Sequence, residues 1–238
     1  LAYDDQTSYA LAILHDLIPA EHEQAAKAYF KATIARSEGR IGTGFIGTPA
    51  LLPALLKIGE PGLAAELFLQ EEVPGWLYQV KMGATTIWER WDAIQPDGTI
   101  YNPQMNSYNH YAYGAVCQWL FEAVAGFRPD PEDPGFATVV FEPTIIGELS
   151  PVAASHDSPR GRISAGWTVD GDKVRYEIEV PEGSRGVLRL APDYREVSVD
   201  GAPFTGGALT AGKHVVRFSY TAPPRQAKTN IKINARTP

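Results

Sequence analysis

The sequence has few features that would cross-link the chain covalently or anchor it in a lipid bilayer. It has one cysteine, Cys117, which excludes a disulfide within the chain. The apolar neighbours of Cys117 predict a small buried side chain, and a reactive thiol is the alternative. No apolar run approaches the ~20 residues that a membrane-spanning helix needs, and Leu1 opens no signal-peptide pattern. We therefore expect no membrane partner.

Positive charge is also scarce. The chain carries 21 Lys and Arg against 28 Asp and Glu, which gives a net charge of −7 at pH 7 and a pI near 5.3. Nucleic acids and anionic membranes are bound through basic patches, and this balance argues against both. We expect no nucleic-acid partner and a neutral solute instead.

Metal and cofactor motifs are missing as well. The five histidines and the single cysteine show no metal-ligand spacing. Residues 41–48, IGTGFIGT, are rich in glycine, but they lack the Gly-Lys-Ser/Thr ending of a phosphate-binding loop and the preceding strand of a dinucleotide site. They predict a tight loop whose backbone passes close to a ligand or a neighbouring segment. We expect neither a catalytic metal nor a cofactor.

Most of the candidate chemistry lies in two nearby stretches, and the first is GATTIWERWD at residues 83–92. Here Glu89 and Arg90 lie between Trp88 and Trp91, and a second carboxylate, Asp92, follows. Carboxyl groups serve as acid, base or nucleophile in glycoside hydrolysis, and an aromatic ring offers an apolar face to a pyranose. The stretch therefore favours a sugar-handling site. A structural ion pair between Glu89 and Arg90, with the indoles as core filler, is the alternative.

The second stretch is MNSYNHYAYG at residues 105–114. His110 follows amide, hydroxyl and phenol groups, and it stands directly before a helix-like run. Loop residues at the ends of regular elements often build binding sites, and a neutral imidazole can present one nitrogen to a ligand. We expect His110 to contact a ligand, with a purely structural histidine as the alternative.

These stretches, with TGFIGTPALLPAL and VPGWLYQVKMGA upstream, resemble the C-terminal part of glycoside hydrolase family 78, the bacterial and fungal α-L-rhamnosidases. The motifs occur in the family's order from about residue 1 to residue 128. Residues 134–136, Pro-Gly-Phe, open the stretch that resembles the family's trailing β-domain. The combination of motifs, rather than any one of them, makes the resemblance specific.

The resemblance implies an inverting hydrolase on an (α/α)6 barrel that releases terminal α-L-rhamnose from a carbohydrate substrate. It implies that Glu89 is the general base and that His110 lines the rhamnose pocket, and Trp88 is a candidate sugar platform. The family's general acid lies in an acidic, Arg-containing motif upstream, which this chain does not contain. We therefore expect the C-terminal portion of a longer enzyme, whose N-terminal part is its partner and without which this chain is inactive.

Two other functions stay open from the sequence. The chain could belong to a different inverting helical-barrel enzyme, either another glycosidase or a glycoside phosphorylase. It could also be a non-catalytic piece that binds sugar or serves a structural role.

The fold class that we expect is mainly α followed by β: part of an (α/α)6 barrel, then an antiparallel β-sandwich. Residues 1–128 would form the barrel part, 129–136 a linker, 137–222 the sandwich and 223–238 a poorly ordered tail. Helical spacing predicts helices at 6–18, 20–36, 49–58, 61–70, 76–82 and 108–125. Short alternating runs predict strands at 137–141, 162–169, 173–180, 186–190, 196–199 and 214–220.

Overall fold

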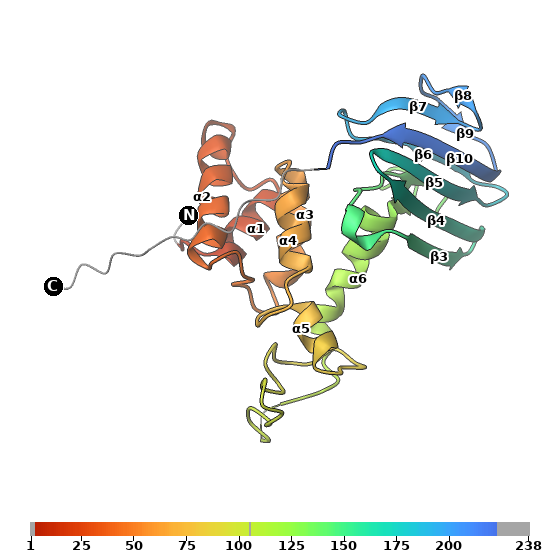
Figure 1. The fold of residues 1–238 in the computed structure, drawn as a ribbon. Coiled ribbons are helices and arrows are strands. Elements are labelled where there is room, and N and C mark those ends of the chain that lie inside the picture. The colour runs from red at the N-terminus through yellow and green to blue at the C-terminus, as the bar shows by residue number, and fades with distance from the viewer. Residues whose placement is uncertain (1–2, 105, 223–238) are drawn as a thin grey trace.

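The computed structural model describes residues 3–104 and 106–222, so the tail expected at 223–238 lies outside the described residues. A helical region and a β-rich region follow one another along the chain, and a continuous helical run leads from one into the other (Figure 1). The expected order, mainly α and then β, is confirmed. Most of the buried apolar side chains form one cluster, which includes Phe30 in the helical region and Phe218 in the β-rich region.

The helical region forms where apolar residues recur at helical spacing. The most extensive contact between its helices joins α1 and α3, and α4 packs on α3. Pro49 and Pro61 stand in the first turns of α3 and α4, where a proline costs no hydrogen bond. The helical elements are α1 (Gln6–Leu14), η1 (Ala20–His22), α2 (Glu23–Arg36), α3 (Thr48–Lys57), α4 (Pro61–Phe68), α5 (Trp76–Lys81), η2 (Tyr111–Ala115), α6 (Val116–Trp119), η3 (Leu120–Ala125) and η4 (Gly147–Leu149).

The first helix is shorter than its apolar pattern predicts. It ends at Leu14 instead of residue 18, because His15 caps it and Asp16 takes a left-handed conformation with φ of 55°. The helix is capped at its start by Asp5, whose carboxylate accepts a bond from the Ser8 N–H at 2.8 Å. Thr7 and Ser8, which could also cap a helix by residue type, lie inside it.

The helix predicted at 108–125 begins only at Tyr111. His110, directly before it, is extended: it has φ of −122° and donates its backbone N–H to Ile87 O at 2.8 Å. The rest is helical but irregular, with a 3₁₀ turn, a short α-helical turn and a π-helical segment in succession. Long-range pairing with the loop at residue 87 therefore overrides the helical periodicity of the first positions.

Two side chains of this helical run are more exposed than the sequence indicates. Cys117 is exposed, so the expectation of a buried cysteine is wrong for the described chain. Phe121 is 40% exposed, whereas Tyr113 and Trp119 are in the core. Both exposed residues lie on a helical run that is apolar on more than one face. A single packed face cannot bury all of its apolar side chains.

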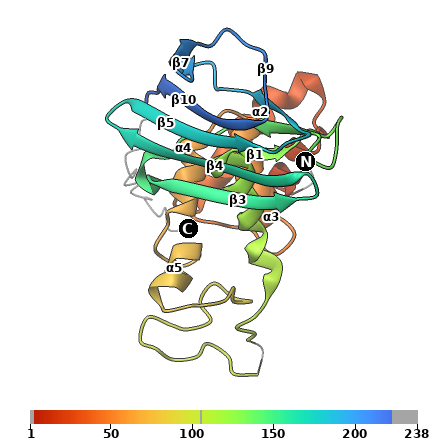
Figure 2. The same cartoon turned by 90° about the vertical axis from the view of Figure 1, so that its right-hand side faces the viewer.

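The β-rich region consists of two sheets, and all six predicted strands are present with small shifts at their ends. The larger sheet has the order β3-β4-β5-β10-β7-β8, and the smaller one has the order β1-β2-β6-β9. Figure 2 shows β3, β4, β5 and β10 side by side across the molecule. The pairs are antiparallel except β2 with β6, which is parallel. The strands are β1 (Phe127–Pro129), β2 (Thr138–Phe141), β3 (Val152–Ser158), β4 (Gly161–Asp170), β5 (Lys173–Val180), β6 (Arg185–Leu188), β7 (Arg195–Val199), β8 (Ala202–Pro203), β9 (Ala208–Leu209) and β10 (Gly212–Ser219).

Strands β1 and β3 and the two-residue strands β8 and β9 were not predicted. Strand β3 has the sequence VAASHDS and lies at the edge of its sheet, so its small and polar side chains are mostly exposed and give no apolar alternation. Strand β1 pairs Phe127 with Phe141 and Pro129 with Val139, which places the first residue of the expected linker inside a sheet. Pro129 is tolerated because β1 is an edge strand.

The junction between helices and sheets is built from two aromatic side chains of the larger sheet. Trp167 Nε1 donates to Val124 O at 2.7 Å, and Tyr176 Oη donates to Ala125 O at 3.0 Å. These carbonyls end a helix and have no partner within it, so the sheet supplies their hydrogen bonds. Gly126 follows with φ of +78°, and a Cβ there would meet Pro143 Cα at 2.4 Å. Only glycine suits this position.

His214 of β10 is bonded at both ring nitrogens. Nδ1 lies 2.8 Å from Asp200 Oδ2 and Nε2 lies 2.9 Å from Thr210 O. Burial lowers the pKa of His214, but the bonds to Thr210 and Asp200, with the carboxylate charge, outweigh it and raise the pKa overall. The Val215 N–H and His214 together lower the pKa of Asp200.

This network predicts a pH-dependent contribution to stability. The stabilisation that His214 contributes is complete below the pKa that it has in the unfolded chain. It is lost as pH rises through the raised pKa that it has in the folded protein. The stabilisation that Asp200 contributes is present above the pKa that it has in the unfolded chain. It is lost as pH falls through the lowered pKa that it has in the folded protein. The melting temperatures of the unmodified protein and His214→Gln should thus differ most between about pH 4 and pH 6.5. Calorimetry across this range checks it, and a difference that is constant up to alkaline pH would contradict it.

Candidate active site

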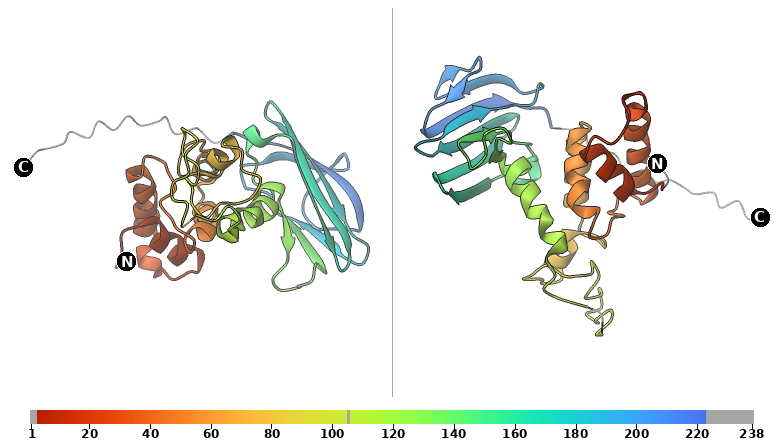
Figure 3. Two further views of the ribbon diagram at one scale, coloured as in Figure 1. Left: turned by 90° about the horizontal axis from the view of Figure 1, so that it is seen from below. Right: turned by 180° about the vertical axis from the view of Figure 1, so that it is seen from behind.

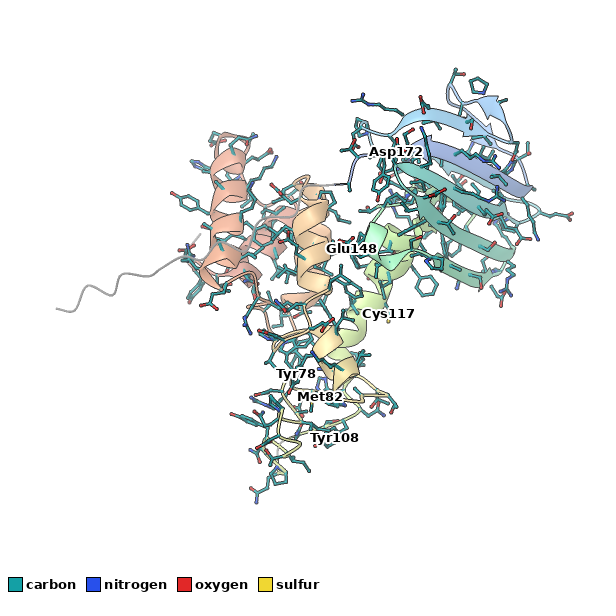
Figure 4. All side chains as sticks on the ribbon, in the orientation of Figure 1. Tyr78, Met82, Tyr108, Cys117, Glu148 and Asp172 are labelled. Carbon is teal, nitrogen blue, oxygen red and sulfur yellow. The ribbon has the colours of Figure 1, made fainter. Side chains whose placement is uncertain are left out.

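The two chemically rich stretches meet in the loop that joins α5 to η2. This loop projects beyond the end of α5 (Figure 3), and Tyr108 marks it in Figure 4. Glu89 donates its backbone N–H to Ser107 O at 2.9 Å, and His110 donates to Ile87 O at 2.8 Å. The two segments therefore run alongside each other, although they form no regular strand.

The Glu89 side chain is half-buried and anchored. Its Oε2 accepts a hydrogen bond from the Ser107 N–H at 2.9 Å. The neighbouring Arg90 pairs with Asp92, Nε to Oδ1 at 3.2 Å, and its guanidinium carbon lies 3.8 Å from the centroid of the Tyr101 ring. An ion pair between Glu89 and Arg90, the structural alternative from the sequence, is therefore wrong: Arg90 takes a different carboxylate.

The His110 ring lies in a stack of three rings. The Phe45 ring lies at 4.6 Å with an interplanar angle of 18°, and the Tyr111 ring lies at 5.9 Å with an angle of 8°. The sequence analysis missed Phe45, which belongs to the glycine-rich loop that was expected to approach a ligand or a neighbour. A lone aromatic among three glycines was the available signal. The stack fixes the plane of the imidazole and leaves its nitrogens for hydrogen bonds.

Trp88 does not have the position that a sugar platform requires. The residue is 3% exposed, and its ring meets the Tyr108 ring edge to face at 5.8 Å. Its backbone N–H donates to Gln79 Oε1 at 3.3 Å. A buried indole presents no free face to a pyranose, so the expectation for Trp88 is corrected to a supporting role beneath the loop.

Trp91 and Tyr113 support the same loop from the helical side. Their rings stack at 3.9 Å with an angle of 18°, and Trp76 meets Trp91 edge to face at 5.3 Å. Trp76 Nε1 also donates to Tyr113 O at 2.9 Å. Burial raises the pKa of Tyr113; the Arg90 charge opposes this and the Glu89 charge adds to it. Tyr113 therefore stays a neutral phenol at neutral pH.

Three buried polar atoms of the second stretch have no hydrogen-bond partner among the described residues: Asn106 Oδ1, Tyr108 Oη and His110 Nδ1. Buried polar atoms are usually paired, and exceptions are common where the groups serve a ligand. They belong to residues 106, 108 and 110 of one irregular segment, which bends at residues 108 and 109. Three unpartnered polar atoms suit a ligand with several hydroxyl groups.

Two features are absent from residues 3–104 and 106–222: a cluster of metal-ligating side chains and a membrane-spanning helix. Within residues 3–104 and 106–222, no three or more His, Cys, Asp or Glu side chains are arranged to hold a metal ion. None of the helices described there is long and apolar enough to cross a bilayer.

One groove of the described structure is separate from these residues. It has a volume of about 1170 Å³ and lies between α1, α3 and the α6 run, bordered by Tyr194 and Tyr220 of the β-rich region. Glu89 and His110 do not line it. The candidate site is thus the α5 to η2 loop and not the groove.

The helical region and the β-rich region after it correspond to a six-hairpin glycosidase domain followed by a C-terminal domain. Residues 1–124 match the bacterial alpha-L-rhamnosidase 6 hairpin glycosidase domain. Residues 126–203 match the bacterial alpha-L-rhamnosidase C-terminal domain. The chain belongs to the bacterial α-L-rhamnosidase family.

Individual relatives agree with this assignment. An alpha-L-rhamnosidase of Streptomyces avermitilis is 40% identical over 191 residues, which cover 80% of this chain and 18% of that protein. An alpha-L-rhamnosidase of Formosa agariphila is 35% identical over 205 residues, or 85% of this chain and 22% of that protein. The chain spans about a fifth of the length of the curated relatives that it matches.

Solved structures show the same fold. The Streptomyces avermitilis alpha-L-rhamnosidase complexed with L-rhamnose matches with a TM-score of 0.82 and 33% identity, covering 90% of this chain and 21% of that one. The native Aspergillus terreus enzyme matches with a TM-score of 0.81 and 35% identity, covering 91% of this chain and 24% of that one.

Proposed function

We propose that this chain carries the general base and part of the rhamnose pocket of an inverting α-L-rhamnosidase, and that the general acid lies upstream in a longer polypeptide, here called the complete enzyme. The observation that supports this most is the Glu89 carboxylate, held at 2.9 Å by Ser107 N–H on the loop that also presents His110. The helical region would then be part of an (α/α)6 barrel whose remaining helices precede it. The short span of the chain relative to its relatives supports that arrangement.

The proposed reaction uses Glu89 as a base. Its ionised carboxylate takes a proton from a water molecule, whose oxygen attacks the anomeric carbon on the face opposite the leaving group. The bond from that carbon to the glycosidic oxygen breaks, and the upstream acid protonates the departing oxygen. Room for the water requires the two carboxyl groups to lie about 6.5 to 9.5 Å apart.

His110 is proposed to hold the rhamnose by hydrogen bonds. The ring is oriented by Phe45 and Tyr111, and its Nδ1 is unpartnered among the described residues. Asn106 and Tyr108 add two further polar atoms for sugar hydroxyls. Trp88 acts from beneath, by packing on Tyr108.

The stereochemistry of the product tests this proposal. The complete enzyme acting on p-nitrophenyl α-L-rhamnoside should release β-L-rhamnose first, because a single displacement inverts the anomeric centre. Proton NMR at early times measures it, and first release of the α-anomer would overturn the single-displacement mechanism. Added phosphate should leave the rate unchanged; a phosphate requirement would indicate a phosphorylase. Rhamnose binding without hydrolysis would indicate a sugar-binding piece.

A further inference from the structure

Glu89 has no regular secondary structure around it. Residues 83–93 belong to neither a helix nor a strand, so no regular ladder of backbone hydrogen bonds fixes them. A general base must nevertheless lie within hydrogen-bond reach of the water that it activates. Misplacement by about 1 Å can lower turnover about 10²-fold. Other groups must therefore hold the backbone that carries this carboxylate.

The buried amide of Gln79 holds the backbone on both sides of Glu89. Gln79 lies on α5 and is 2% exposed. Its Oε1 accepts from the Trp88 N–H at 3.3 Å, and its Nε2 donates to Arg90 O at 3.3 Å. These are the residues immediately before and after Glu89. The side-chain amide thus pairs with the loop as a neighbouring strand would, and it leaves the Glu89 N–H free to bond Ser107.

The two bonds also fix the orientation of the amide. Exchanging its oxygen and nitrogen would set the oxygen against the Arg90 carbonyl and the NH₂ group against the Trp88 N–H, and both contacts would be repulsive. The helix that carries Gln79 is itself tied to the loop. Tyr78 Oη donates to Ile94 O at 2.7 Å, and the Ala84 N–H donates to Gln79 O at 2.9 Å. Figure 4 labels Tyr78 on this helix.

We propose that Gln79 is a positioning residue for the reaction: its amide fixes the peptide groups flanking Glu89 and so directs the carboxylate at the attacking water. The inference rests on the proposed role of Glu89 as the base. Gln79 acts through Glu89 and contacts neither substrate nor water in this scheme. It therefore affects the catalytic step more than sugar binding.

Two substitutions in the complete enzyme test this role. Gln79→Leu keeps the size of the side chain but removes both bonds, and kcat should fall about 10²-fold while KM stays near its original value. Gln79→Glu keeps the acceptor for Trp88 and adds a negative charge beside the base. The acidic limb of the kcat/KM profile should then move to higher pH.

Gln95→Leu is the matched control. Gln95 lies on the same loop, and its Nε2 donates to Asp92 O at 2.8 Å, but it does not flank Glu89. The same chemical change there should leave kcat near its original value. Rates are measured on p-nitrophenyl α-L-rhamnoside, and the melting temperature of each variant shows whether it is folded.

The outcomes separate this inference from the proposed function. If Glu89→Gln abolishes turnover but Gln79→Leu matches Gln95→Leu, the role of Gln79 is wrong and the base assignment stands. If Glu89→Gln retains turnover, the base assignment itself fails. If Gln79→Leu does not fold, Gln79→Glu decides by its pH profile. An unmoved profile, or failure of both variants to fold, would mean that Gln79 is only structural.

Discussion

Glu89→Gln in the complete enzyme should lower kcat by about 10²- to 10⁴-fold, the contribution expected of a general base. The amide is nearly the same shape as the carboxylate and can still accept the bond from the Ser107 N–H, so the loop should keep its position. It cannot take a proton from water. KM should therefore stay close to its original value, since only the catalytic step is affected.

Steady-state kinetics with p-nitrophenyl α-L-rhamnoside measures this effect. Asp97→Asn is a suitable control, because Asp97 is an exposed carboxylate of the same loop whose described bonds are to Thr99. It should leave kcat unchanged. A Glu89→Gln variant that is unfolded would return Glu89 to a structural role, and a folded variant with near-normal kcat would remove it from the mechanism.

Trp167→Ala should have the largest effect on stability, with a loss of about 3 to 5 kcal/mol in the free energy of unfolding. Trp167 is 1% exposed and packs at the junction of the helical and β-rich regions. Its removal leaves a cavity and deprives Val124 O of its 2.7 Å hydrogen bond from Nε1. The helix end would then keep an unpaired, buried carbonyl group.

Trp167→Phe separates the two contributions. It keeps most of the ring but removes the N–H donor, so the loss should be about 1 to 3 kcal/mol. Equilibrium unfolding in guanidinium, followed by circular dichroism, compares the variants. Equal losses for the alanine and phenylalanine variants would show that the hydrogen bond, and not the packing of the indole, dominates at this junction.

The residues whose motifs identify the family were recognisable without a structure. Glu89 and His110 lie in local motifs whose order and composition are specific, and the helices with clear apolar spacing were found close to their true limits. The strands β4, β5 and β10 were also found, because they alternate exposed and buried positions along their length. Local sequence was sufficient where one face of an element is buried and the other is exposed.

The errors concern positions where distant contacts override local pattern. The extended backbone at His110 depends on its bond to Ile87 O, and no helical periodicity reveals that partner. The edge strand β3 has mostly polar and small side chains, so its backbone pairing with β4 defines it. Trp88 has the composition of a sugar platform, and only packing against Tyr108 shows that it is buried.

The sequence by itself determined the order of helices and strands, the family and the candidate residues Glu89 and His110, because these follow from local pattern and motif. The tertiary structure alone decided that Arg90 pairs with Asp92, that Phe45 stacks on His110 and that Gln79 brackets Glu89. Phe45 and His110 belong to two separate loops, and Gln79 bonds to backbone groups 9 and 11 residues further along the chain. Such contacts arise only when the chain has folded and buried polar groups have found their partners, and no local rule specifies them.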